Sequence, residues 1–275
     1  MTGAEHPQRP TVRLIGAPTD RNSSFLRGAA AAPAAIRAAL ASDHANLAAE
    51  NGLELGDDVL LRDAGDLALT EEEADHGRIR EAVATALAEG DVPLLLGGDH
   101  SVSFPAVEAV AMGLGPVNIL HFDAHPDLYH DFGGNPYSHA SPFARIMERG
   151  YARRLVQVGI RTLNRHARAQ AERFGVELVE MRHFAPERVP IPEGPLYVSV
   201  DLDGLDPAFA PGVSHHEPGG LSTRELLSVL HRITSPIVGA DVVELNPSRD
   251  VGGVTAVLAA KLVKELASLT GRSRR

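Results

Sequence analysis

Metal-binding residue types are concentrated in residues 121–143, HFDAHPDLYHDFGGNPYSHASPF, which contain three Asp and four His directly after the apolar run PVNIL. In an extended segment alternate side chains point to the same side, so Asp123, His125 and Asp127 can face one ligand together. Carboxylates and imidazoles in this arrangement are typical ligands of a metal ion. Asp and His are also common where loops begin, and this alternative stays open for the segment taken alone.

Three other segments place polar side chains directly after apolar runs. His100 follows two glycines in GGDHS, Asp201 and Asp203 alternate in DLDGLDP, and Glu244 closes IVGADVVE. Two carboxylates as close as Asp201 and Asp203 repel each other unless a cation lies between them. The alternatives are an Asx turn around Gly204 and a tight or phosphate-binding turn at the glycine pair. All of these alternatives must hold together if no metal binds.

Apolar runs that alternate with helical patterns predict the scaffold. Strands are expected at 11–16, 59–63, 92–97, 117–122, 154–159, 176–180, 196–201 and 237–244, and helices at 31–40, 71–90, 101–113, 141–150, 165–175, 222–233 and 253–269. The strand runs are continuously apolar, which is typical of a parallel sheet covered on both faces. We therefore predict one α/β domain, a three-layer α/β/α sandwich with a mostly parallel sheet. Ligands of such sheets bind beyond the carboxyl ends of the strands, where all four polar segments fall.

Several helix ends are also marked in the sequence. Ser222 and Glu225 have the spacing of a capping box at the start of a helix. Gly90, Gly150 and Gly175 follow helical runs, where glycine commonly ends a helix.

The donor set indicates which metal would bind. There is no cysteine, so the ligands must be imidazoles and carboxylates. The candidate ligands are His100, Asp123, His125, Asp127, Asp201 and Asp203. They are too many for one tetrahedral zinc, whereas carboxylate-rich sets suit Mn²⁺, and bridging carboxylates suit two ions about 3.5–4 Å apart. A water between two such ions becomes a hydroxide near neutral pH, which favours hydrolysis.

Composition excludes other classes of protein. The net charge of −10, with no cluster of Lys or Arg, argues against nucleic-acid binding. No apolar stretch reaches about 18 residues, so no membrane span is expected. The polar N-terminus lacks the apolar region of a signal peptide, and we expect a cytoplasmic protein. The single domain is expected to fill residues 1–275, with disordered tails at 1–10 and 270–275.

Five motifs resemble the ureohydrolase family of arginases and agmatinases: GGDHS, FDAHPD, YSHASPFARIMERGYARRL, DLDGLDPAFAPGVSHHEPGGLS and GADVVELNPSRD. The resemblance runs from about Val12 to Leu269. Within the family the chain is most similar to plant-type arginases, through NSSFLRGAAAAP, NPYSHASPFARIME and APGVSHHEPGGLS.

The resemblance implies an arginase/deacetylase-like fold with two Mn²⁺ ions per subunit. One ligand set would be His100, Asp123, Asp127 and Asp203, and the other His125, Asp123, Asp201 and Asp203. Asp123 and Asp203 would then bridge the two ions. By analogy with related enzymes, a homotrimer or homohexamer is expected.

The resemblance also assigns catalytic roles. Glu244 would bind the guanidinium group, for which a carboxylate is a matched acceptor. His139 would move protons or hold the substrate, and Asp127 would pass a proton from the hydroxide to the leaving amine. The implied reaction is attack of the metal-bridging hydroxide on the guanidinium carbon, which converts L-arginine to L-ornithine and urea.

Recognition of the substrate's tail is where this chain departs from agmatinases. Their loop at 212–220 usually has neutral residues where this chain has His215 and His216. One of these, together with Arg161 and Asn135, is expected to bind a carboxylate and so favour arginine over agmatine; His215 is our candidate. His216 is expected to face solvent.

Other functions remain open from the sequence. An agmatinase or another guanidino-acid hydrolase would use the same centre, and a non-catalytic protein that binds metal and guanidines is a third possibility. A binuclear phosphoesterase is disfavoured, because the Gly-Asn-His and Gly-His-x-His motifs of those enzymes are missing. Histidines without motif support are expected to be surface or structural residues: His44, His76, His121, His130, His166, His183 and His231.

Overall fold

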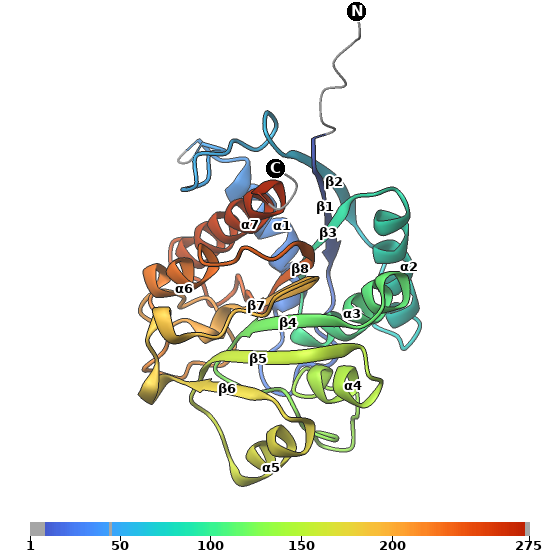
Figure 1. Cartoon of the computed structure of the whole chain (residues 1–275), viewed down its shortest axis with the longest axis vertical. Helices are drawn as coiled ribbons and strands as arrows, with labels where there is room; N and C mark the ends of the chain where they lie inside the picture. The colour runs from blue at the N-terminus through green and yellow to red at the C-terminus, as the bar shows by residue number, and fades with distance from the viewer. Residues whose placement is uncertain (1–8, 44–45, 273–275) are drawn as a thin grey trace, which may run out of the picture.

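The centre of the molecule is an eight-stranded sheet in the order β2-β1-β3-β8-β7-β4-β5-β6, seen in a computed structural model that describes residues 9–43 and 46–272 (Figure 1). Every neighbouring pair of strands is parallel, which confirms the predicted sheet. The strands are β1 (Thr11–Ala17), β2 (Leu60–Asp66), β3 (Val92–Gly97), β4 (Val117–Phe122), β5 (Ala152–Ile160), β6 (Glu177–Glu180), β7 (Leu196–Asp201) and β8 (Ile237–Val243).

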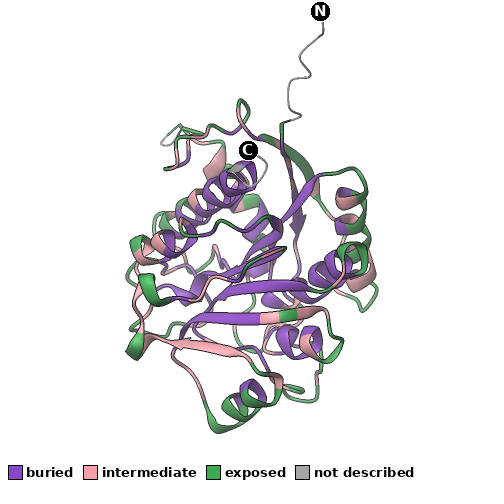
Figure 2. Ribbon diagram, in the orientation of Figure 1, coloured by how far each residue is buried: buried purple, intermediate pink, exposed green. Residues whose placement is uncertain are grey.

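Helices cover both faces of the sheet, as expected for three layers. They are α1 (Ala32–Leu40), α2 (Asp75–Ala88), α3 (Ser103–Leu114), α4 (Pro142–Glu148), α5 (Arg165–Phe174), α6 (Thr223–Leu230) and α7 (Val254–Arg272). One core joins α1, α6 and α7 to the sheet, and a second core joins α2, α3, α4 and α5 to its other face. The central strands are buried along their length (Figure 2). Within the described ranges, no helix is both long and apolar enough to span a membrane.

Local signals in the sequence explain several helix ends. Ser222 accepts a hydrogen bond from the backbone N–H of Glu225, whose carboxylate in turn accepts one from the N–H of Ser222. This confirms the capping box, which satisfies two N–H groups that a helix start leaves free. Gly175 ends α5 in the left-handed region at φ 66°, where glycine has no steric penalty.

The chain ends differ in part from expectation. Residues 1–8 of the expected N-terminal tail lie outside the described residues, as does His44. At the other end α7 continues to Arg272, so residues 270–272 are helical rather than part of a tail, and 273–275 are not described. Thr270 is buried in this helix, so packing of the last turn extends it.

Candidate metal centre

The strand order brings the four polar segments together. Strands β3, β8, β7 and β4 are consecutive neighbours in the middle of the sheet, and each carries one polar segment at its carboxyl end. His100 lies in the short helix η2 (His100–Val102) after β3, and Asp123 follows β4 directly. Asp201 is the last residue of β7, and Asp203 lies in the next turn, η5 (Leu202–Gly204).

His100 is the centre of one group of ligands. Its Nδ1 atom lies 3.2 Å from Asp123 Oδ2, 3.0 Å from Asp127 Oδ2 and 3.2 Å from Asp201 Oδ2. His100 is fully buried, and its Nδ1 has no hydrogen-bond partner in the described part of the chain. A buried ring nitrogen that faces three carboxylate oxygens has the geometry of a ligand for a cation between them.

His125 is the centre of a second group on the other side of Asp123. Its Nδ1 atom lies 3.3 Å from Asp123 Oδ1 and 3.2 Å from Asp203 Oδ2. Asp123 therefore uses one oxygen toward each histidine, which suits a carboxylate that bridges two ions. The His125 side chain is 29% exposed, so this group forms the open side of the centre.

These contacts correct the expected ligand sets. Asp203 was expected in both sets and Asp201 in the His125 set alone. In the structure Asp201 faces His100, and of the two histidines Asp203 faces only His125. The reason is local: the chain turns into η5 directly after Asp201, whose side chain accepts the N–H of Asp203 at 2.8 Å. This turn moves Asp203 away from the line of β7, so simple alternation along a strand no longer applies.

Burial and the closeness of the carboxylates shift the pKa values of the residues in the centre. Burial raises the pKa of Asp201 well above its usual range, and the nearby charges of Asp203 and Asp123 add to this rise. Burial also raises the pKa of Asp203. Burial alone would lower the pKa of His100, but its contacts with Asp123, Asp127 and Asp201 outweigh this effect and raise it well above its usual value. A cation between such groups favours the charged form of the carboxylates, and two divalent ions fit the donor set.

Glu244 and His139 form a pair beside the carboxylates. His139 Nδ1 and Glu244 Oε1 are 2.8 Å apart, and the same carboxylate oxygen accepts the N–H of His100 at 2.9 Å. Burial raises the pKa of Glu244, but His139 outweighs this and lowers it overall, so the group is a carboxylate at neutral pH. Burial lowers the pKa of His139, yet Glu244 raises it overall to about 9.

Ser24, which the sequence did not single out, limits where His139 can hold a proton. The backbone N–H of Ser24 points at His139 Nε2 from 3.1 Å, and the Ser24 hydroxyl is 2.8 Å from the same atom. In its neutral form the ring accepts this N–H at Nε2 and carries its proton at Nδ1, which donates to Glu244. The raised pKa of His139 favours a second proton, which would go to Nε2. Protonation at Nε2 would break the contact with Ser24, so this atom is placed to exchange a proton.

Two residues of the centre have unusual backbone conformations. Asp127 has φ 48° and Glu244 has φ 65°, in the left-handed region that residues other than glycine rarely adopt. Such positions cost about 1–3 kcal/mol each and tend to occur at functional sites. The N–H of Glu244 donates to the carbonyl of Gly98 at 2.9 Å. A Cβ atom on Gly98 would lie 1.7 Å from the carbonyl oxygen of Thr19, so this close approach requires glycine.

The expected substrate-tail residues do not all reach the centre. His215 does, because its ring centroid lies 5.7 Å from that of His125 and 5.4 Å from that of His139. Burial lowers the pKa of His215, so its ring is neutral. The amide of Asn135 donates to Asn22 at 3.0 Å, which places it at the edge of the site. His216 is exposed, as expected, and its ring contacts the carbonyl of Pro211.

Arg161 has a structural role in place of the expected substrate contact. All three of its guanidinium nitrogens donate to backbone carbonyls at 2.7–3.2 Å, those of Gly159, Asp203, Gly204, Leu205 and Glu217. The side chain therefore connects the turn that carries Asp203 to the loop that carries His215. Because its nitrogens already donate to these carbonyls, the guanidinium group is not placed to bind a substrate carboxylate as well.

If Arg161 has this structural role, its replacement should lower the stability of the fold and not only the recognition of a carboxylate. Arg161→Met keeps the apolar stem but leaves the carbonyls without donors, and we expect the free energy of unfolding to fall by about 2–4 kcal/mol. Chemical denaturation with urea measures this change. The control is Arg182→Met at an exposed position, where the change should stay within about 0.5 kcal/mol. Equal effects of the two substitutions would contradict the structural role.

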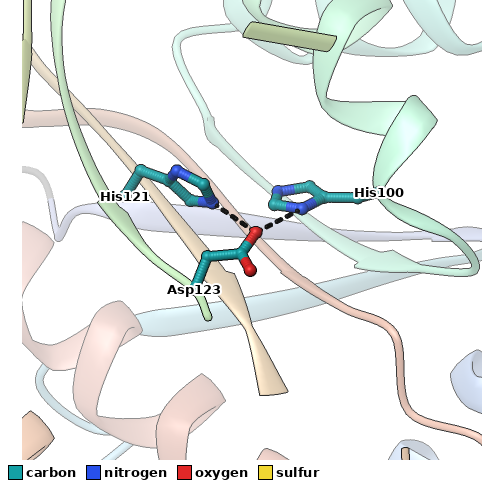
Figure 3. Close-up of side chains that lie close together, drawn as sticks. All are labelled: His100, His121 and Asp123. Carbon is teal, nitrogen blue, oxygen red and sulfur yellow. Dashed lines mark hydrogen bonds and ion pairs between the residues drawn. The ribbon is translucent and has the colours of Figure 1, made fainter. Parts of the chain in front are cut away.

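Other polar residues around the ligands had no motif support. His121 is fully buried, and its Nε2 lies 2.9 Å from Asp123 Oδ2 on the side away from His100 (Figure 3). Ser199 lies 2.9 Å from His100 Nε2 and donates to Asp241 Oδ1 at 2.6 Å. His121 and Ser199 each precede a ligand by two residues in a strand, and this spacing is the signal that could have identified them.

The comparisons with known proteins agree with this geometry. The arginase family matches residues 10–268 of the chain. The chain is 53% identical over 277 residues to "Arginase 1, mitochondrial" from Arabidopsis thaliana, covering 94% of this chain and 81% of that protein. It is 52% identical over 270 residues to the rice (Oryza sativa subsp. indica) protein of the same name, covering 92% and 79%.

A solved structure shows the same fold. The arginase from Medicago truncatula has a TM-score of 0.90 to this chain at 49% sequence identity, and the match covers 95% of this chain and 87% of that one.

The two sequence relatives are mitochondrial by name, which contradicts the cytoplasmic location expected from the sequence. That expectation depended on the composition of the N-terminus, whose residues 1–8 are not described.

Proposed function

The chain belongs to the arginase family, and from that premise we propose that it hydrolyses L-arginine to L-ornithine and urea with two Mn²⁺ ions per subunit. The observation that carries the proposal is the position of Asp123 between two histidines, with Oδ2 toward His100 and Oδ1 toward His125. The whole described chain would act as one catalytic domain. A homotrimer or homohexamer belongs to the same proposal, and sedimentation of the Mn²⁺-loaded protein tests it.

The contacts suggest how the ligands divide between the two ions. His100, Asp127 and Asp201 would hold one ion, and His125 and Asp203 the other, with Asp123 shared. Asp201 would belong to the first ion and Asp203 to the second, because each lies against the histidine of that group. When bound, the two ions would supply a water of lowered pKa and neutralise charge that develops on the substrate.

The remaining chemistry falls to side chains of this chain. Glu244, a buried carboxylate at neutral pH, would accept N–H groups of the planar guanidinium and hold its carbon next to Asp123 and Asp127. Asp127 would accept the proton of the attacking water at a carboxylate oxygen. His139 would deliver a proton to the leaving amine from Nε2, the atom that faces Ser24.

The substrate's tail would lie toward the loop at 213–220. His215 is neutral and faces the open side of the centre, so it can donate an N–H to a carboxylate. Asn135 stands at the edge of the same site and would contribute its amide after exchanging its contact with Asn22. These two residues would favour L-arginine over agmatine, which lacks the carboxylate.

Urea release by the Mn²⁺-loaded protein, with L-arginine and agmatine compared at equal concentration, tests the proposal directly. Turnover of arginine is expected. Turnover of agmatine alone would keep the metal chemistry and replace arginase by agmatinase. If neither compound is turned over and two ions still bind, the function is hydrolysis of another guanidino acid or binding of a guanidine.

Removal of one ligand should remove one ion. We expect His125→Ala to lower the bound metal from about two ions per chain toward one and to abolish most activity, because only the His125 group loses a donor. Inductively coupled plasma mass spectrometry after dialysis measures the metal content. His216→Ala removes an exposed imidazole from the neighbouring loop and is the matched control. Unchanged metal content in His125→Ala would refute its assignment as a ligand.

A further inference from the structure

His121 and Gln157 form a buried pair behind the metal centre. They are register partners on the neighbouring strands β4 and β5, so their side chains emerge on the same face of the sheet. Both are fully buried. The His121 ring stacks on Phe143 of α4 at a centroid distance of 4.0 Å, which fixes its plane.

The orientation of the Gln157 amide is determined by a third group. Gln157 Nε2 lies 2.6 Å from the carbonyl oxygen of Pro126, and an oxygen in its place would put two acceptors in contact. The nitrogen therefore faces Pro126, and Gln157 Oε1 is left without a partner in the described part of the chain. The same Nε2 lies 3.0 Å from His121 Nδ1. Its second hydrogen is thus donated to the ring.

The amide in turn determines where His121 holds its proton. Because Nδ1 accepts from Gln157, the neutral ring carries its hydrogen on Nε2. Nε2 lies 2.9 Å from Asp123 Oδ2, the oxygen that also faces His100 (Figure 3). His121 therefore donates a hydrogen bond to the carboxylate and has no lone pair for an ion, although it lies close enough to His100 and Asp123 to be taken for a third ligand.

We propose that His121 and Gln157 are a positioning pair for the metal centre: Gln157 fixes the tautomer of His121, which aims Asp123 Oδ2 at the His100 side. The proposal rests on the two-ion centre described under the proposed function. Gln157 also holds Pro126, which lies between the ligands His125 and Asp127. One amide nitrogen thus anchors the ligand segment 123–127 at two points, through His121 at its start and directly near its end.

The expected effect of losing the pair is on metal affinity. Loss of outer partners of metal ligands typically weakens metal binding about 10–100-fold. Gln157→Met keeps the length and approximate volume of the side chain, but methionine donates no hydrogen bond. In the full chain we expect Mn²⁺ binding, measured by equilibrium dialysis and by the electron paramagnetic resonance signal of free Mn²⁺, to weaken by about 10-fold or more.

The chain offers a matched control. Gln170 is also a buried glutamine, and its Nε2 donates at 3.0 Å to the carbonyl of Leu128, directly after the ligand segment, but no hydrogen bond joins it to His121. Gln170→Met should leave the Mn²⁺ dissociation constants within about 3-fold of the wild type. If Mn²⁺ binding weakened equally in Gln157→Met and Gln170→Met, the cause would be general loosening of the segment, and the positioning role of His121 and Gln157 would be overturned.

A second variant separates positioning from direct ligation. Gln157→Glu accepts rather than donates at His121 Nδ1, which turns the Nε2 lone pair toward Asp123. The proposal expects weaker Mn²⁺ binding, at least as weak as in Gln157→Met. If His121 were itself a ligand, an acceptor at Nδ1 would favour its Nε2 lone pair, and Mn²⁺ would bind more tightly. Tighter binding would therefore overturn the proposal.

Failure of the two-ion function gives a different result from failure of the pair. Wild-type protein that binds no Mn²⁺ would refute the proposed function, and the pair would fall with it. If the wild-type protein binds two ions and Gln157→Met binds Mn²⁺ with the same affinity, only the positioning role of His121 and Gln157 would be refuted. Circular dichroism and thermal unfolding of each variant establish that the compared proteins are folded.

Discussion

Glu244→Gln is expected to lower kcat/KM for L-arginine by about 10³-fold while both ions remain bound. Glutamine keeps the size of the side chain and an oxygen for the N–H of His100, but it removes the negative charge that holds a guanidinium group. It also removes the charge that keeps the His139 proton at Nδ1. Metal content should not change, because Glu244 is outside both groups of ligands.

Steady-state urea release and metal analysis on the same sample measure the two halves of this prediction. Glu217→Gln is the matched control, since Glu217 is an exposed carboxylate on the loop that borders the site. It should keep kcat/KM within about 3-fold. Wild-type kinetics in Glu244→Gln would disprove the guanidinium contact, and loss of metal would assign Glu244 to the support of the ions instead.

Asp123→Asn is expected to empty both metal positions, a larger loss than any other single substitution in the centre. Asp123 faces His100 through one oxygen and His125 through the other. Its contacts with His100, His121 and His125 outweigh the effect of burial and hold its pKa well below the usual range, so Asp123 stays charged. An amide there loses the charge and points an N–H₂ group at a cation.

Metal analysis should therefore give close to zero ions in Asp123→Asn at Mn²⁺ concentrations that saturate the wild type, with activity reduced by about 10³-fold or more. Asp203→Asn is the comparison, because Asp203 faces His125 alone and its loss should leave about one ion. Equal metal contents in the two variants would contradict the shared position of Asp123. If Asp203→Asn lost both ions, Asp203 would contribute to both metal positions, as the family resemblance implies.

Much of the fold was predictable because its determinants are local. Continuous apolar runs mark strands buried on both faces, and each expected strand is present within a few residues. The capping box at Ser222 and the glycine after α5 act within a single turn, so the sequence shows them directly. The helical structure of residues 270–272 was not predicted, because packing of the last turn extends α7 and packing is not a local property.

The residues of the centre were predictable to the extent that their spacing was simple. All six candidate ligands lie in one cluster, since each follows a strand of the parallel sheet. The division of Asp201 and Asp203 between the histidines was not predictable, because it depends on the turn at η5. Arg161 carries a charge that suggests a ligand for a carboxylate, but its actual partners are backbone carbonyls that come together only in the folded chain.

By itself the sequence determined which segments form strands and helices, which strands end in imidazole and carboxylate groups, and that these groups suit manganese. Only the tertiary structure decided that β3, β8, β7 and β4 lie side by side, so that residues from 100 to 244 share one centre. The physical reason is that pairing between strands far apart in the chain is set by packing of the whole sheet. The same pairing places Gln157 of β5 against His121 of β4, a contact that no local pattern in the sequence specifies.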